Sequence, residues 1–218
     1  HFQSSIAALV AGKPIVWQLH SSLSPSFVRR LYMIWISLVS DVLMTSGTET
    51  ANNHPGTRKF GDRLFPFMAP VDSDIFSPKE KIREHYRNLL GIPEHSILVA
   101  TVGNRVWMKR HDLFAEVARC IQKQRKDVYF RIIGAPVYVN KLDYFRKVVE
   151  KNKDLFENKF LDFADPGPDV SGYMKAIDIF AITSLKEGTS LVTQEAMATG
   201  LPVVGFAAGS LTDSIIHG

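Results

Sequence analysis

Short apolar runs of strand length alternate with segments of helical periodicity along most of this chain of 218 residues. The runs at 97–102 and 128–133 are dominated by β-branched and aromatic residues, as buried strands are. Strands are predicted at 14–19, 41–45, 64–69, 97–102, 128–133, 160–164, 177–183 and 202–207. Helices are predicted at 26–40, 79–90, 109–124, 141–152, 169–176, 191–199 and 210–216.

This alternation, with its short connections, predicts an α/β fold built on a parallel sheet with helices on both faces. Because crossover connections are right-handed, the expected architecture is a Rossmann-like, doubly wound sheet. Ligands of such sheets bind at the carboxyl ends of the strands. The loops at 103–108, 134–140, 164–169 and 184–190 are therefore the expected binding region.

Residues 70–78 carry proline at both ends and show no periodicity, which is the composition of a linker. We therefore predict two units, residues 1–76 with the linker included and residues 77–218. The first unit starts within a helical pattern that no strand precedes, and the second stops as a helix ends. These ends predict a fragment, or an incomplete chain.

The composition is that of an ordinary soluble globular protein, with 45% apolar and 22% charged residues. The net charge of +4 fits either solvated surface lysines or a bias toward phosphate-bearing ligands and anionic membranes. Cys120 is the only cysteine, which excludes an intramolecular disulfide and a cysteine-based metal site and fits the cytoplasm. No histidine pair has the spacing of zinc hydrolases, and no nucleic-acid-binding signature is present.

The longest apolar stretch, residues 31–44, is interrupted by two serines and Asp41. It falls short of the roughly 18 apolar residues that a membrane-spanning helix needs. The pattern favours a buried helix that runs into a strand. Because Arg29 and Arg30 come just before it, the alternative is peripheral contact with the cytoplasmic face of a membrane.

Two glutamates eight residues apart, Glu187 and Glu195, follow the predicted strand at 177–183. Glu187 falls in the loop, and Glu195 about one turn inside the next helix. The free backbone N–H groups and the dipole at that helix start form an anion site, which Gly188 lets a ligand approach closely. A pyrophosphate there would leave one carboxylate for the hydroxyls of a sugar and the other for a ribose. The alternative is an ordinary surface helix, because glutamate at a helix start is favoured by the dipole.

A second cluster follows the predicted strand at 97–102 and contains Gly103, Arg105 and Lys109. A glycine at the turn followed by cations suits a diphosphate, because arginine forks onto phosphate oxygens and lysine supplies a point charge. The alternative is a basic helix start with solvated side chains, which the helix dipole disfavours slightly.

His20 follows the predicted strand at 14–19, at a strand end where ligands bind. A lone histidine is nevertheless more often structural than catalytic. Asp72-Ser73-Asp74 has the pattern of a metal-binding pair of aspartates, but its place in the linker favours turn chemistry.

Together these residues resemble the retaining glycosyltransferases of family four, the group 1 glycosyl transferases, which have the GT-B fold of two Rossmann-like domains. The block from Glu187 to Val204 is similar to the family's glutamate-x7-glutamate motif with the following AMAxGxPVV. The segments 102–109, 90–94 and 13–20 are similar to its diphosphate segment, its lead-in to the first strand, and its N-terminal-domain strand with histidine. The resemblance implies that residues 1–76 end an acceptor-side domain and that 77–218 form the donor domain, truncated at its end.

The resemblance also implies a role for each residue. Glu187 would contact the donor sugar, and His20 would face it from the opposite domain. Glu195 would hold the ribose, while Lys109 and an arginine neutralise the leaving diphosphate. Backbone amides would come from Gly188, Thr189, Ser190 and Leu191. Neither a bound metal nor a cofactor is implied, and the departing phosphate itself would take the acceptor's proton.

The sequence departs from the family at several positions. Asn104 stands where arginine is common, with Arg105 after it, and Arg110 replaces the usual glycine after the lysine. Thr189 and Ser190 stand where phenylalanine and glycine are common. The implied function is transfer of a hexose from a nucleotide-diphosphate sugar to a glycan, lipid or small molecule. The alternatives are a nucleotide-binding fragment without catalysis and a GT-B-type sugar-nucleotide epimerase.

Overall fold

The computed structural model describes residues 2–20, 24–135 and 142–216. Contacts between Cα atoms divide the chain into two compact units. Unit 1 contains His1–Ala69, Glu187–Ser190 and Gly209–Gly218, and unit 2 contains Pro70–Lys186 and Leu191–Ala208. No helix in the described ranges has the length and apolar character needed to cross a membrane.

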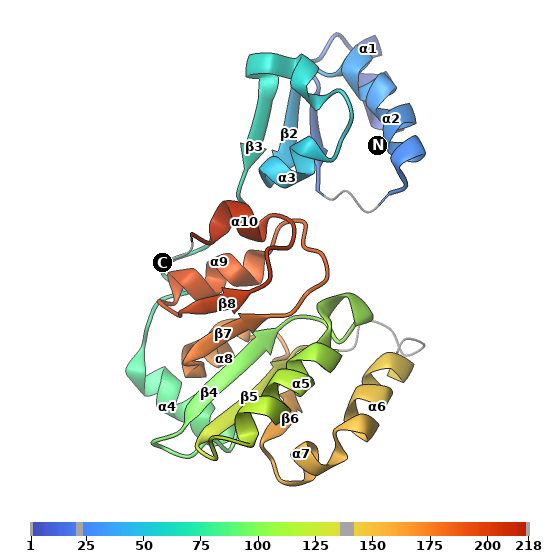
Figure 1. The fold of residues 1–218 in the computed structure, drawn as a ribbon. Coiled ribbons are helices and arrows are strands. Elements are labelled where there is room, and N and C mark those ends of the chain that lie inside the picture. The colour runs from blue at the N-terminus through green and yellow to red at the C-terminus, as the bar shows by residue number, and fades with distance from the viewer. Residues whose placement is uncertain (1, 21–23, 136–141, 217–218) are drawn as a thin grey trace. The chain divides into compact units, whose positions relative to one another are not determined.

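Unit 1 is built on a parallel three-stranded sheet of order β1-β2-β3 (Figure 1). The strands are β1 (Val16–Leu19), β2 (Val42–Ser46) and β3 (Leu64–Phe67). The helices are α1 (Phe2–Val10), α2 (Ser26–Val39), α3 (Gly47–Asn52) and α10 (Leu211–Ser214), with a 3₁₀ segment at Thr57–Arg63. The core of the unit joins α2, the sheet and the 3₁₀ segment through Leu19, Met33, Ile36, Leu43 and Phe60.

Unit 2 is built on a parallel five-stranded sheet of order β6-β5-β4-β7-β8. The strands are β4 (Ile97–Val102), β5 (Val128–Ile133), β6 (Leu161–Ala164), β7 (Ile179–Ile182) and β8 (Val203–Gly205). The helices are α4 (Glu80–Leu89), α5 (His111–Gln122), α6 (Leu142–Lys151), α7 (Lys153–Glu157), α8 (Val170–Ala176) and α9 (Leu191–Ala198). In one core cluster α5, α6 and α7 pack on the sheet, while α4 packs against α8.

The two parallel sheets with flanking helices confirm the predicted Rossmann-like α/β class. The strand order also fixes where the chain changes direction. The chain runs from β4 outward through β5 to β6, and then returns to place β7 and β8 on the other side of β4. The β4–β7 pair is therefore the topological switch point, where ligands of doubly wound sheets bind.

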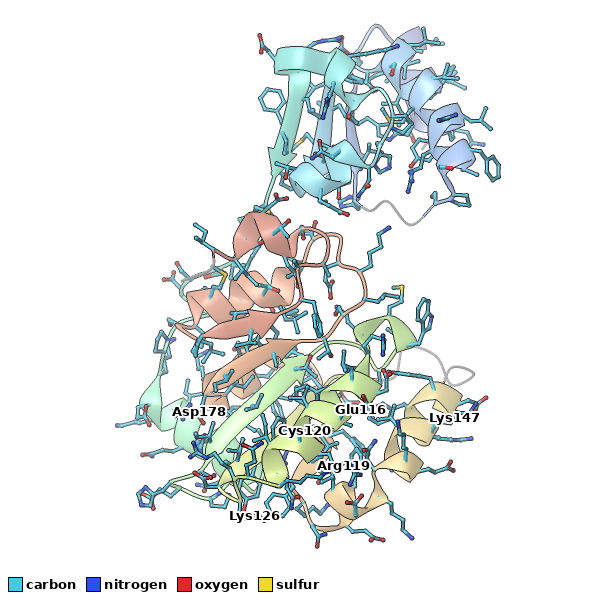
Figure 2. All side chains as sticks on the ribbon, viewed as in Figure 1. Glu116, Arg119, Cys120, Lys126, Lys147 and Asp178 are labelled. Carbon is cyan, nitrogen blue, oxygen red and sulfur yellow. The ribbon has the colours of Figure 1, made fainter. Side chains whose placement is uncertain are left out.

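A partly buried ion cluster holds α4 to this sheet. Asp178, labelled in Figure 2, accepts hydrogen bonds from Arg83, from Arg87 and from the backbone N–H of Leu98. Arg87 is buried, and it also donates to the carbonyl of Ser96 at 2.6 Å. Charge-assisted hydrogen bonds of this kind are among the strongest in proteins, and they fix α4 against the first strand of unit 2.

The structure differs from the predicted elements at several places, among them α3 and the 3₁₀ segment at Thr57–Arg63, which lie outside the predicted helices. The helix predicted at 109–124 is divided, because a 3₁₀ turn at Trp107–Lys109 precedes α5 and Arg110 between them has a φ of +52°. The short helix α7 was not predicted, because its five residues carry too few apolar positions to show a period.

Candidate functional site

The loop after β4 and the loop after β7 are hydrogen-bonded to one another at the switch point. The hydroxyl of Thr183 donates to the backbone carbonyl of Lys109 at 3.0 Å. The backbone N–H of Leu185 donates to the carbonyl of Met108 at 2.9 Å. The segment that bears the predicted cations is therefore fixed to the segment that leads into Glu187.

Gly103 is the point where Lys109 folds back over the end of β4. Its φ of +151° is unusual for residues with a side chain, and a Cβ there would lie 3.2 Å from the Lys109 Cε. The lysine stem therefore packs along the glycine backbone, and Lys109 is partly buried. The structure thus brings together two of the predicted site residues.

Gly134 directly follows β5 and lies against the backbone of Gly103, at the carboxyl ends of β4 and β5. A Cβ on Gly134 would lie 1.9 Å from the Gly103 carbonyl oxygen, which is closer than any side chain permits. The Gly103 N–H donates to the Ile133 carbonyl at 2.9 Å, and the Arg105 N–H to the Ala135 carbonyl at 3.1 Å. We call this backbone-to-backbone contact of Gly103 with Gly134 the glycine seam.

Arg105 directs its guanidinium toward α6 and β6. The guanidinium carbon lies 4.8 Å from the ring centre of Phe163 and 5.3 Å from that of Phe145, a cation–π arrangement on both rings. Burial lowers the pKa of Arg105, while the nearby Asp165 carboxylate opposes that shift. Arg105 follows β4 and Asp165 follows β6, so both lie at the carboxyl ends of the strands, with the β5 end between them.

The residues after Lys109 form a second polar cluster. Arg110 donates to the Asp112 carboxylate from Nε and from Nη2, at 3.0–3.1 Å, and Tyr144 of α6 donates to the same carboxylate at 2.6 Å. The Arg110 backbone is left-handed, with φ +52° and ψ +48°. Glycine takes that conformation without strain, whereas a residue with a Cβ does not.

His111, the first residue of α5, is fully buried. Its Nε2 donates to the Asn104 carbonyl at 3.2 Å, and its ring meets Phe145 edge-on. Burial lowers the pKa of His111 to about 4, against the smaller opposing effect of the Asn104 carbonyl. His111 is therefore neutral at physiological pH and holds the loop at Asn104 in place without adding charge.

Glu187 is buried, with 7% of its surface exposed, and Ser190 just before α9 is buried as well. The Glu187 backbone is held by the loop after β8, because the Ser210 N–H donates to the Glu187 carbonyl at 3.4 Å. A Cβ on Gly209 would lie 1.8 Å from that carbonyl oxygen, so only glycine fits. The segment that carries Glu187 is thus a fixed element of unit 1.

Glu195 lies one turn inside α9, as the sequence predicts, and its side chain is half-buried. Burial raises the pKa of its carboxyl group. Among the described residues, the carboxylate has neither a hydrogen-bond nor an ion-pair partner. A half-buried carboxylate without a partner is unfavourable in the free protein and becomes favourable when hydroxyl donors reach it.

The remaining candidates are His20 of unit 1 and Asp72 of the linker. His20 is exposed, directly after β1, and lines a cavity of about 410 Å³ in unit 1 with Gln18, Ser4 and Ser5. Asp72 forms a turn, because its carboxylate accepts from the N–H of Asp74 at 2.9 Å, so the prediction of turn chemistry is confirmed. In the described part of the chain, no group of three or more His, Cys, Asp or Glu residues could hold a metal ion.

Sequence reasoning did not single out Gly134, Thr183 or Gly209, although each fixes a loop that carries a predicted site residue. Gly134 directly follows a predicted strand, Thr183 ends one, and Gly209 lies in the loop after one. A search for small residues at every strand end would therefore have found them, without showing what they contact.

The sequence profile of the glycosyl transferases group 1 matches residues 82–218, more than half of the chain. A D-inositol 3-phosphate glycosyltransferase from Corynebacterium glutamicum is 30% identical over 163 residues, covering 72% of this chain and 38% of that protein. A UDP-Gal:alpha-D-GlcNAc-diphosphoundecaprenol alpha-1,3-galactosyltransferase from Escherichia coli is 31% identical over 137 residues, covering 62% of this chain and 34% of that protein. The chain thus spans less than half the length of these curated relatives.

The fold is similar to that of HepE from Anabaena, whose crystal structure contains UDP and glucose. The TM-score is 0.83 at 21% sequence identity, and the match covers 99% of this chain and 58% of that one. The profile match, the curated relatives and the fold all agree. The chain belongs to the glycosyl transferases group 1 family and has the Rossmann-like architecture of GT-B glycosyltransferases.

Proposed function

We propose that this chain supplies the donor-binding part of an enzyme that moves a hexose from a nucleotide-diphosphate sugar to an acceptor, with retention of configuration. The observation that carries the proposal is the pair of hydrogen bonds that fixes the Lys109 loop to the β7–α9 loop at the switch point. A ligand bound there meets a lysine on one loop and a helix start on the other. These are two features that favour a diphosphate.

We assign the diphosphate to Lys109, to Arg105 and to the backbone amides from Gly188 to Leu191. Glu195 holds the ribose, because its partnerless carboxylate matches two neighbouring hydroxyl donors. Glu187 contacts the hydroxyls of the donor sugar, and His20 faces that sugar from the acceptor-side domain. In this proposal cations and amides stabilise the leaving diphosphate, so the reaction needs no metal ion.

Residues 1–76 then end the acceptor-side domain, and residues 77–218 form the donor domain. The acceptor is a glycan, a lipid-linked sugar or a small phosphorylated molecule, in line with the acceptors named for the Corynebacterium and Escherichia coli relatives. We also propose that the enzyme works at the cytoplasmic face of a membrane. UDP is the first nucleotide to test, because HepE contains it and the Escherichia coli relative is named for a UDP-sugar.

Isothermal titration calorimetry of the chain with UDP, GDP and ADP tests the proposal. One nucleotide should bind, and Lys109→Ala and Glu195→Ala should each weaken its binding by at least about tenfold, or about 1.4 kcal/mol. Lys151→Ala and Glu157→Ala are matched controls on exposed ion pairs, and both should bind like the wild type. Wild-type affinity in both site variants would contradict the assignment.

A nucleotide-binding module without catalysis is the second candidate. Incubation with nucleotide sugars separates the two functions. Sugar transfer or donor hydrolysis supports the enzyme, whereas binding with neither reaction supports the module.

A further inference from the structure

Tyr86 of α4 contacts the start of α8 at three residues. Its hydroxyl donates a hydrogen bond to the carboxylate of Asp169, the residue that caps α8. Its ring meets that of Tyr173 edge-on, with 4.8 Å between the ring centres. The hydrogen bond to Asp169 raises the pKa of Tyr86 to about 12, because the carboxylate needs the phenol proton as its donor.

Gly172, the third residue, lets the Tyr86 ring lie directly on the backbone of α8. A Cβ at Gly172 would lie 2.3 Å from two ring atoms of Tyr86, closer than any side chain permits. The Gly172 N–H also donates to the Asp169 carboxylate at 2.9 Å. Glycine inside a helix is less stable than alanine, so the close approach of the ring gives a reason for its presence. We call Tyr86, Asp169 and Gly172 the tyrosine brace.

The loop that the tyrosine brace ends, residues 164–169, is stiffened from within. Two of its six residues are proline, and the Asp165 carboxylate accepts from the Gly167 N–H at 3.0 Å. A short loop with few free torsions moves as one piece, so its position is set at its two ends. The first end continues β6, which the ladder with β5 fixes. The second end is Asp169, which Tyr86 holds.

Helix α4 gives the tyrosine brace a firm base, because the ion cluster at Asp178 fixes α4 to the sheet. Two arginines of α4 hold the other end of α8. Arg83 donates to the carbonyl of Lys175 at 3.2 Å. Arg87 donates to the carbonyl of Ala176 at 3.2 Å. Helix α4 therefore holds α8 at both of its ends, and the hold at the start of α8 includes the tyrosine brace.

The start of α8 lies on the face of the sheet that carries Glu195. The chain moves across the sheet in one direction from β4 to β6 and in the opposite direction from β6 to β8. Because crossovers are right-handed, α5, α6 and α7 cover one face, whereas α8 and α9 cover the other. On that second face α8 packs against α9. The loop 164–169 and the start of α9 therefore lie on one face, at the carboxyl ends of the strands.

We propose that Tyr86 is a positioning residue for the base of the nucleotide, because it fixes the loop 164–169 on which the base rests. This inference rests on the proposed function, in which Glu195 holds the ribose. The base is attached to that ribose, and the loop 164–169 is the neighbouring strand end on the same face. A loop that is held in place discriminates between bases, because its polar groups cannot move to suit a wrong one.

Calorimetric titration with UDP, GDP and ADP tests the inference through the ratio of the three affinities. The wild type should prefer one nucleotide over the other two at least about tenfold. Tyr86→Phe keeps the ring on Gly172 but removes the hydrogen bond, and should reduce that preference at least about threefold. Gly172→Ala displaces the ring and should reduce the preference as well, although alanine favours the helix. A purely structural role of Tyr86 would lower the melting temperature and leave the ratio unchanged.

Tyr129→Phe is the matched control, because it makes the same change near the amino end of β5, where Tyr129 stacks on Phe160. It should keep the wild-type ratio, and thermal melting should show that each variant is folded. A wild type without preference, a wild-type ratio in Tyr86→Phe, or an equal loss in Tyr129→Phe overturns the inference.

The two proposals fail in different ways. If the wild type binds no nucleotide, or Lys109→Ala binds like the wild type, the proposed function fails and the inference fails with it. If nucleotide binding depends on Lys109 while Tyr86→Phe keeps the wild-type ratio, only the positioning role of Tyr86 is refuted.

Discussion

The hydroxyl of Thr183 donates a hydrogen bond of 3.0 Å to the backbone carbonyl of Lys109. This single bond joins the end of β7 to the loop that follows β4, on either side of the switch point. Thr183 is buried, with 7% of its surface exposed. A hydrogen bond in such a place contributes about 0.5–1.5 kcal/mol.

Thr183→Val removes this bond while keeping the shape of the side chain. We expect nucleotide affinity to fall about threefold to tenfold, because the Lys109 loop loses one of its two hydrogen bonds to the β7–α9 loop. The measurement is a calorimetric titration with the nucleotide that the wild type binds. Thr101→Val makes the same chemical change in β4, at another buried threonine, and should leave the affinity unchanged. Equal losses in the two variants would show that the link itself has no role in binding.

Glu195→Gln should make the free protein more stable and the nucleotide complex weaker. Burial raises the pKa of Glu195, so the fold favours the protonated form, and the charged form costs stability once the pH exceeds about 4.5. The neutral amide removes that cost, and we expect a melting temperature about 1–2 °C higher at neutral pH. The advantage should disappear as the pH falls below the normal glutamate range. Nucleotide affinity should drop about tenfold, because hydroxyl donors lose a charged acceptor.

Glu157→Gln serves as the comparison for this stability effect, since Glu157 is exposed on α7. It should change neither the melting temperature nor the affinity. A Glu195→Gln protein that melts below the wild type would refute the view of Glu195 as an uncompensated carboxylate.

Replacement of Arg110 by glycine should leave the protein more stable than replacement by alanine. At a φ of +52° any residue with a Cβ is strained by about 1–2 kcal/mol, and both replacements lose the Asp112 ion pair equally. We therefore expect Arg110→Gly to unfold with a free energy about 1 kcal/mol higher than Arg110→Ala in urea titrations. Arg119, labelled in Figure 2, also forms an ion pair but lies inside α5. There the order should reverse, because glycine destabilises a helix interior by about 1 kcal/mol relative to alanine.

His111 should make the fold sensitive to acid. Its pKa in the fold is about 4 and its ordinary value is 6.5, so as the pH falls through that interval only the unfolded chain gains the proton. The contribution of His111 to the free energy of unfolding is fully present above pH 6.5. It falls by about 3 kcal/mol as the pH drops to 4. His111→Phe should flatten the decline in unfolding free energy by about that amount. His95→Phe, at an exposed position, should follow the wild-type curve. An unchanged slope in His111→Phe would show that another group causes the decline.

The sequence predicts the sheet of unit 2 well for a physical reason. The runs at Ile97–Val102 and Val128–Ile133 are short, apolar and bounded by breakers, and both are strands with those limits. The helix that carries Glu195 begins at Leu191 as predicted, because the glycine and serine before it and Gly200 after it punctuate the pattern. Local signals of this kind act within a few residues and need no tertiary information.

The details of the site could not be predicted in the same way. The surroundings of Arg105 come from Phe145 and Phe163, which lie 40 and more residues away and meet it only after the sheet forms. The left-handed backbone at Arg110 is one that arginine rarely adopts, and no neighbouring residue in the sequence predicts it. The contact of Gly103 with Gly134 depends on the parallel register of β4 with β5, which sets Val102 beside Ile133.

In the proposed donor site, the glycine seam limits how a new donor preference can arise. At Gly134 even a methyl group would meet the Gly103 carbonyl oxygen at 1.9 Å, so the backbone there has no room to accept larger residues. A library that randomises Gly134 should therefore return glycine almost alone, whatever sugar nucleotide is used for selection. New specificity has to come from side chains around an immobile seam, such as Thr189 and Arg105, rather than from moving the strand ends themselves.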